Sequence, residues 1–142
     1  MIMEESDLKL SDKDFIRLND LYPPTEKSAD VGKRAIEIVK HFYKNKDPNS
    51  TFRVPAGGGD LEIQSEGRIF QIEVKGTAET DICWMKLKVS GRPSYELLVQ
   101  GMPLYRVCGV NDRFPTVYIL KYQKDYEMVP EPRWSIRPKR MA

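Results

Sequence analysis

Two stretches decide which fold this sequence predicts: Gly57-Gly58-Gly59-Asp60-Leu61-Glu62-Ile63, followed by Gln71-Ile72-Glu73-Val74-Lys75-Gly76-Thr77. In both, apolar and polar residues alternate with the period of two that is typical of a β-strand. The apolar positions of each stretch share one side, which must pack on a core. The polar positions, including Asp60, Glu73 and Lys75, share the other side and are left available for chemistry.

The turn between the two strands sets which residues face each other. Glu66-Gly67 is predicted to be a tight two-residue turn. With that turn Asp60 lies opposite Glu73, with their Cβ atoms roughly 5 Å apart. Two carboxylates in this position repel each other, and a divalent cation with hard oxygen ligands removes the repulsion. A slip of one residue in the register would separate the pair.

Lys75 lies two residues after Glu73 on the same side of the strand. An ammonium group there can orient a water molecule and offset the charge that builds on a phosphate in a transition state. We therefore expect Asp60 and Glu73, with the backbone carbonyl of Val74, to bind Mg²⁺, for which Mn²⁺ can substitute. The polar neighbours on these strands, Gln71 and Glu62, are expected to support the site. This set predicts metal-assisted hydrolysis of a phosphodiester bond.

The elements around the motif predict an α/β (α+β) protein, because strands follow and precede helices on one sheet. A short helix is expected to run from Asp12 to about Asn19, and a longer amphipathic helix from near Ser28 or Asp30 to about Asn45. A third helix is expected over residues 94–100. Strands are expected over residues 51–54, 60–65, 69–75, 82–89, 104–110 and 116–122. The domain prediction is an acidic N-terminal arm (1–27), a core domain (28–123) and a Pro/Arg-rich tail (124–142).

Composition and charge argue against a disordered, membrane-spanning, secreted or disulfide-rich protein. The 142 residues are 40% hydrophobic and carry a net charge of +2, which argues against a disordered chain. No stretch reaches the roughly 20 apolar residues of a membrane span, and the first residues do not resemble a secretory signal. Two cysteines, Cys83 and Cys108, are too few for a disulfide framework and predict buried thiols in the cytoplasm. Residues 1–30 hold eight acidic and four basic residues, a net of −4, which leaves +6 for the remainder.

Asp60, a spacer of twelve residues and Glu73-Val74-Lys75 inside an apolar strand resemble the motif of the PD-(D/E)XK nuclease superfamily. This superfamily includes many restriction endonucleases, archaeal Holliday-junction resolvases and repair nucleases. The phrase Ile72-Glu73-Val74-Lys75-Gly76-Thr77 is especially similar to its small members of uncharacterised function. The resemblance covers roughly residues 30–122. It implies a restriction-endonuclease-like mixed sheet of about four to five strands with flanking helices, and Mg²⁺-dependent endonuclease activity on DNA.

The resemblance also implies further site residues. A glutamate of the preceding helix often serves as an extra metal ligand, which is Glu37 here. The helical wheel places Glu37 in the middle of the polar face, whereas Arg34 and His41 lie nearer its boundary. Gly59 stands where the family often has a proline. A polar residue of the helix after the motif often assists, and Gln100 or Tyr95 fits that role.

Four basic residues are predicted to contact a nucleic-acid backbone: Lys86, Lys88, Arg92 and Arg34. An ordinary solvated strand face explains Lys86 and Lys88 equally well. The expected partner is DNA, with RNA as an alternative, and the near-neutral charge predicts modest, salt-sensitive affinity. One active site cuts one strand, so double-strand or junction cleavage predicts a homodimer. The alternative function is a non-catalytic nucleic-acid-binding or protein-interaction module that retains the nuclease fold.

Overall fold

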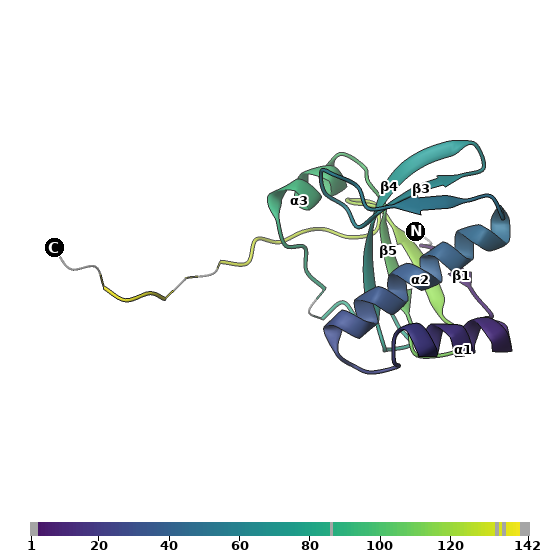
Figure 1. The fold of residues 1–142 in the computed structure, drawn as a ribbon. Helices are drawn as coiled ribbons and strands as arrows, with labels where there is room; N and C mark the ends of the chain where they lie inside the picture. Colours follow the sequence, from purple (N-terminus) through teal and green to yellow (C-terminus); the bar gives the residue numbers. More distant parts are fainter. Residues whose placement is uncertain (1–2, 86, 133, 135, 140–142) are drawn as a thin grey trace.

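A computed structural model describes residues 3–85, 87–132, 134 and 136–139 of the chain. Within them a six-stranded sheet has the strand order β1-β6-β5-β4-β3-β2, with helices packed on it (Figure 1). The elements in chain order are β1 (Glu4–Asp7), α1 (Asp12–Leu21), α2 (Ser28–Lys46), β2 (Thr51–Arg53), β3 (Leu61–Ser65), β4 (Arg68–Thr77), α3 (Arg92–Val99), β5 (Leu104–Cys108) and β6 (Thr116–Leu120). The predicted mixed α/β class is confirmed.

The sheet is mixed because one neighbouring pair of strands is parallel. β2, β3 and β4 form an antiparallel meander, and β5 pairs antiparallel with β6, which pairs antiparallel with β1. β4 and β5 run parallel, and the connection between them contains α3. Parallel neighbours require such a crossover, since a tight turn reverses the chain direction.

The hairpin of β3 and β4 has the register that the sequence predicts. Glu62 pairs with Gln71 and Ser65 pairs with Arg68, so Glu66 and Gly67 alone form the turn. Both turn residues have positive φ, 52° and 77°. That conformation matches the right-handed twist of the strands it joins, and glycine adopts it without a Cβ clash.

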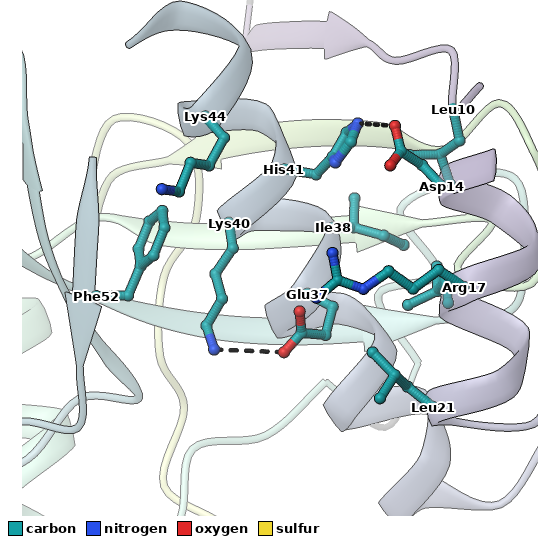
Figure 2. Close-up of a pocket in the computed structure, with 11 residues that line it drawn as sticks. Leu10, Asp14, Arg17, Leu21, Glu37, Ile38, Lys40, His41, Lys44 and Phe52 are labelled. Carbon is teal, nitrogen blue, oxygen red and sulfur yellow. Dashed lines mark hydrogen bonds and ion pairs between the residues drawn. The ribbon is translucent and has the colours of Figure 1, made fainter. Parts of the chain in front are cut away.

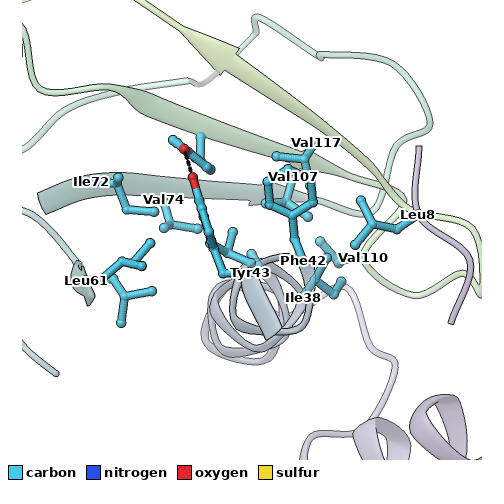
Figure 3. Close-up of a cluster of buried hydrophobic side chains, with 14 of the residues drawn as sticks. Leu8, Ile38, Phe42, Tyr43, Leu61, Ile72, Val74, Val107, Val110 and Val117 are labelled. Carbon is cyan, nitrogen blue, oxygen red and sulfur yellow. Dashed lines mark hydrogen bonds between the residues drawn. The ribbon is translucent and has the colours of Figure 1, made fainter. Parts of the chain in front are cut away.

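The main hydrophobic core lies between α2 and one face of the sheet (Figure 3). On β4, the even-numbered residues Ile72 and Val74 face this helix, where they pack in one cluster with Ile38. Gly76 continues that side, because a Cβ atom on it would lie 2.7 Å from the Cβ of Ala35 in α2. Alternation along a strand then places Glu73 and Lys75 on the opposite face of the sheet.

A second cluster covers that opposite face. Its buried members are Leu98 and Met102, at and after α3, with Leu104 of β5 and Leu120 of β6. Residues that follow β6, Tyr126 and Met128 among them, pack against it. The described residues of the tail beyond this point form neither helix nor strand, and in Figure 1 they run away from the body. Among the described residues, no helix combines the length and apolar character that crossing a bilayer requires.

The prediction of four to five strands is wrong, since the sheet has six. Residues Glu4–Asp7 form the strand β1, whose charged sequence gives no strand signal, and they pair with residues 116–119 of β6. The segment predicted as an N-terminal arm also supplies buried side chains to the main cluster: Leu8, Leu10 and Leu18.

The strand predicted over residues 82–89 is also wrong, since none of its described residues is in a strand. β5 is already paired with β4 and β6, so no free edge of the sheet is available beside it. Arg106 of β5 instead donates hydrogen bonds to the carbonyl oxygens of Ile82 (2.7 Å) and Cys83 (2.9 Å). These bonds hold the segment as a loop, in which Cys83 has a φ of 53°.

Candidate functional site

Asp60 lies directly before β3 and is fixed by β4 through two hydrogen bonds. Its backbone N–H donates to the carbonyl oxygen of Ile72 (2.9 Å), the residue that pairs with Leu61 at the end of the ladder. Its Oδ2 accepts a hydrogen bond from the backbone N–H of Val74 (2.8 Å). The Asp60 carboxylate is therefore held against the strand that carries Glu73 and Lys75.

Glu73 is nearly inaccessible to solvent, with 3% of its surface exposed. Its backbone N–H donates to the carbonyl oxygen of Pro103 (3.0 Å), and its side chain shares hydrogen bonds with Asp60 and Ser94. Burial, and then the hydrogen bond and negative charge of Asp60, raise the pKa of Glu73 to about 8. Near neutral pH, and without a metal, a proton therefore joins the two carboxyl groups. The register of β3 and β4 ends at Leu61 and Ile72, so Asp60 and Glu73 are not a paired position of the ladder, although their side chains interact.

The raised pKa of Glu73 predicts how the stability of the metal-free protein depends on pH. Because the folded state holds the proton more tightly than the unfolded chain, this stabilisation is complete below the ordinary pKa of 4.5 and is lost as the pH rises through about 8. In EDTA, the melting temperature should fall between about pH 4.5 and about pH 8 and level off above that. The Glu73→Gln variant, which mimics the protonated form, should show a flatter profile. Equal slopes for the two proteins would contradict the assignment.

Lys75 brings a positive charge to the same face. It is half-buried on β4, next to Arg106 in the register with β5. Its charge lowers the pKa of Glu73, although by less than burial and Asp60 raise it. None of the described side chains forms an ion pair with Lys75. Its ammonium group thus lies near the carboxyl pair without a fixed partner in the described part of the chain.

The glycine-rich loop allows the chain to approach the site closely. Gly59 has a φ of 79°, and a Cβ atom there would lie 3.1 Å from Sδ of Met102 and 3.3 Å from the carbonyl oxygen of Ile72. Its N–H donates to Oγ of Ser94 (3.4 Å), the same serine that bonds Glu73. Ser94, at the start of α3, therefore ties the loop to the buried carboxyl group.

The oxygen atoms at this point fit a hard divalent cation. Asp60 and Glu73 supply carboxylate oxygens. The N–H of Val74 points to Asp60, and in a strand the carbonyl of the same residue points to the same side. Mg²⁺ binds such oxygens through one or two carboxylates and keeps several waters. Among the described residues no group of three or more His, Cys, Asp or Glu side chains could hold a metal ion, so this site offers two carboxylates.

Glu37 does not lie with these two carboxylates. It forms an ion pair with Lys40 (3.3 Å) on α2, and it lines a cavity of about 220 Å³ between α1 and α2 with Arg17 and His41 (Figure 2). Since α2 covers the face of the sheet opposite Glu73, the sheet separates Glu37 from the site. As the wheel indicates, Glu37 is in the middle of the helix's polar face and not at its boundary with the core.

The supporting polar residues have mixed positions. Glu62 lies beside Gln71 but forms an ion pair with Arg53, its neighbour on β2. Gln100 is exposed at the end of α3, and Tyr95 is 45% exposed. The residue of this helix that contacts Glu73 is Ser94, which is not among the predicted site residues. The serine directly after Pro93, at the start of the helix, is the one signal that could have identified it.

Two of the four residues predicted to contact nucleic acid are at the surface. Lys88 pairs with Glu131 (2.7 Å), and Arg92 pairs with Glu96 (3.1 Å). Arg34 is wholly buried. Its guanidinium donates hydrogen bonds to the carbonyl oxygens of Val110 (2.8 Å) and Tyr22 (2.8 Å) and to the side chain of Asn19 (2.9 Å). It therefore has no surface to offer a nucleic acid. Lys86 lies outside the described residues.

Comparison of the chain with protein-family models, with curated proteins and with solved structures gives no match. The function of this chain is therefore inferred from its own residues. The arrangement that most clearly indicates a function is the hydrogen-bonded pair of Asp60 and Glu73, with Lys75 on the same face of the strand. Buried carboxyl groups with a raised pKa are typical of functional sites, although ion-pair networks also perturb pKa values.

Proposed function

We propose that this protein is a Mg²⁺-dependent nuclease that hydrolyses phosphodiester bonds in DNA, with Mn²⁺ able to replace Mg²⁺. The observation that carries the proposal is the carboxyl pair of Asp60 and Glu73. Glu73 lies within β4, on the same strand as Lys75. A protein that only needs stability gains little from burying two carboxyl groups together, because both lose hydration and repel each other once ionised.

The order of the elements supports the restriction-endonuclease-like fold as part of this proposal. The helix before the motif, α2, covers one face of a mixed sheet, as the resemblance implies. Asp60 precedes the second strand of the meander β2-β3-β4, and Glu73 and Lys75 lie on its third strand. α3 then connects to the parallel strand β5. The elements β1, α1 and β6 are additions to this arrangement.

Each residue has a distinct task in the proposed reaction. Asp60, Glu73 and the Val74 carbonyl hold the cation, and Ser94 fixes the orientation of Glu73. The bound cation supplies positive charge that polarises the phosphate. Lys75 orients the attacking water and balances the negative charge that grows on the phosphate oxygens. The water forms the new P–O bond, and the leaving deoxyribose oxygen takes up a proton when its bond to phosphorus breaks.

A metal-binding experiment tests the two carboxylates directly. Wild-type protein should cleave DNA in Mg²⁺ or Mn²⁺ and not in EDTA. Asp60→Asn should weaken Mn²⁺ binding about 10- to 100-fold in a calorimetric titration, because it replaces a charged ligand by an amide. Glu37→Gln is the matched control, since this carboxylate lies on the opposite face of the sheet, and it should bind Mn²⁺ as the wild type does.

The outcomes separate the enzyme from a binding module. If Asp60→Asn binds Mn²⁺ with wild-type affinity, the assignment of the metal site is wrong. If the wild type binds DNA but cleaves plasmid, linear and branched substrates in none of these metals, the protein is a non-catalytic module that retained the fold. Cleavage that persists in EDTA would rule out the metal-dependent mechanism.

Two further proposals concern the setting of the reaction. Cleavage of both strands requires two active sites, so we propose a homodimer for double-strand or junction substrates.

The thiols of Cys83 and Cys108 are free, with Cys108 buried. Unpaired thiols fit a reducing compartment, and we propose a cytoplasmic location on this basis.

A further inference from the structure

The loop between β4 and α3 lies beside the proposed site because Arg106 fixes it there. Arg106 of β5 is next to Lys75 in the parallel register, so both side chains leave the same face of the sheet. The buried guanidinium of Arg106 donates hydrogen bonds to the backbone carbonyl oxygens of Gly76 (3.0 Å), Ile82 (2.7 Å) and Cys83 (2.9 Å). One side chain therefore ties the strand that carries Lys75 to the loop that follows it.

Trp84 is the next residue of this loop, and its backbone is fixed on both sides. Arg106 holds the carbonyl that precedes it, and the N–H of Leu87 donates to its own carbonyl oxygen (3.1 Å). Trp84 is nevertheless 46% exposed, and Met85 beside it is 78% exposed. None of the described aromatic rings packs on the ring of Trp84.

An exposed tryptophan on a fixed backbone is suited to contact with another molecule. Tryptophan is highly buried on average, because its ring offers more apolar surface than almost any other side chain. Leaving half of Trp84 in water forgoes part of that stabilisation. A ring whose backbone is already held in place loses little conformational entropy when a partner packs on it.

The neighbourhood of Trp84 indicates that this partner is a nucleobase. The backbone before Trp84 is separated from Lys75 by one side chain, that of Arg106. Lys75 and the carboxyl pair are proposed to act on a phosphate of DNA, and each phosphate is flanked by the bases of its own strand. Any base can stack on an aromatic side chain, whatever its identity. Within a duplex the neighbouring base pairs cover both faces of a base, so only an unpaired base offers a free one.

We propose that Trp84 stacks on an unpaired base near the phosphate bound at Asp60 and Glu73, so that the substrate is single-stranded where it is cleaved. The inference rests on the proposed nuclease function and narrows its substrate to single strands, flaps and open junctions. Trp84 is then a substrate-contacting residue outside the carboxylate and lysine motif. Arg106 is a positioning residue, because it acts by holding the loop.

The first test observes each tryptophan alone, since the chain has two. Trp134→Phe leaves Trp84, and Trp84→Phe leaves Trp134, which is 92% exposed in the tail. Both variants are titrated in Ca²⁺ with a single-stranded DNA oligonucleotide. Base stacking should quench the fluorescence of Trp84 saturably in Trp134→Phe. The fluorescence of Trp134 in Trp84→Phe should not change with saturation of the site.

The second test measures affinity for the same oligonucleotide and for a blunt duplex of the same sequence. Trp84→Ala should weaken binding of the single strand about 5- to 100-fold, the usual effect of one lost base stack. Its binding of the duplex should stay within about twofold of wild type. Trp134→Ala is the matched control and should bind both probes as the wild type does. Trp84→Tyr keeps a smaller ring and should recover part of the lost affinity.

The outcomes separate this inference from the nuclease proposal. Quenching of Trp84 and a selective loss of single-strand affinity support it, even if the wild type cleaves nothing, in which case only the hydrolytic function fails. Single-strand binding by Trp84→Ala within about twofold of wild type would overturn it and leave the nuclease proposal intact, as would equal losses for both probes or in Trp134→Ala. If Trp84→Ala does not fold, the quenching in Trp134→Phe decides. A wild type that neither binds a probe nor cleaves DNA would overturn both.

Discussion

Replacement of Lys75 by alanine is expected to slow Mg²⁺-dependent DNA cleavage about 10²- to 10³-fold without unfolding the protein. Lys75 is the one charged donor that β4 places beside Glu73 among the described residues. Removing a preorganised donor from a reaction that builds negative charge usually has an effect of this size. The half-buried side chain supports few core contacts, so the melting temperature should change little. Single-turnover cleavage with saturating enzyme measures the effect on the chemical step.

Two controls make the Lys75 result specific. Lys40→Ala removes a lysine that pairs with Glu37 on the opposite face of the sheet, and it should cleave at the wild-type rate. Lys75→Arg keeps the charge but changes its shape and reach, so it should recover part of the lost activity. A Lys75→Ala protein that is folded and within threefold of the wild-type rate would remove Lys75 from the mechanism.

Replacement of Gly76 by alanine is expected to lower the free energy of unfolding by about 1–3 kcal/mol, which is the usual cost of overpacking a core. A Cβ atom at this position would lie 2.7 Å from Cβ of Ala35 and 3.0 Å from the carbonyl oxygen of Val31. Both atoms belong to α2, and the carbonyl oxygen is part of its backbone, so the helix must move away from β4. The melting temperature should fall by about 5–10 °C.

Gly32, on the same helix, is the matched control. Nothing lies within 4 Å of a Cβ atom at this position, and the residue is inside α2. Gly32→Ala should therefore raise the stability by about 0.5–1 kcal/mol through helix propensity alone. The same chemical change is thus expected to have opposite signs at Gly76, which packs against α2, and at Gly32, whose Cβ position is open. Destabilisation of equal size in both variants would contradict the close approach of α2 to β4.

Local sequence signals were sufficient for the hairpin and its carboxyl pair. Glu66-Gly67 is a short turn with one available geometry, and the alternation on both sides fixes the face of each residue. This register places Asp60 and Glu73 near each other, although the ladder itself ends at Leu61 and Ile72. The amphipathic pattern of α2 likewise identifies its buried stripe of Ala35, Ile38 and Val39.

The remaining features depend on contacts between distant parts of the chain. β1 is a strand because β6 lies beside it, more than a hundred residues later, and its own charged residues favour no such structure. Residues 82–89 alternate like a strand, yet β5, to which Arg106 ties them, already pairs with β4 and β6. Arg34 looks like a surface cation in the sequence, but the carbonyl of Val110 lies where its guanidinium can bond it. Ser94 meets Glu73 only through the packing of α3 against the sheet.

The three carboxylates of β1 protect one edge of the sheet against pairing with another molecule by charge repulsion. Glu4, Glu5 and Asp7 are exposed on the outermost strand, whose free backbone groups would otherwise invite a strand from another molecule. Two copies aligned there would bring like charges together along the whole edge. At the other edge β2 has three residues, too few for an extensive ladder. The homodimer proposed for double-strand cleavage should therefore form through helices or loops, and loss of residues 4–7 should promote aggregation through an uncovered β6.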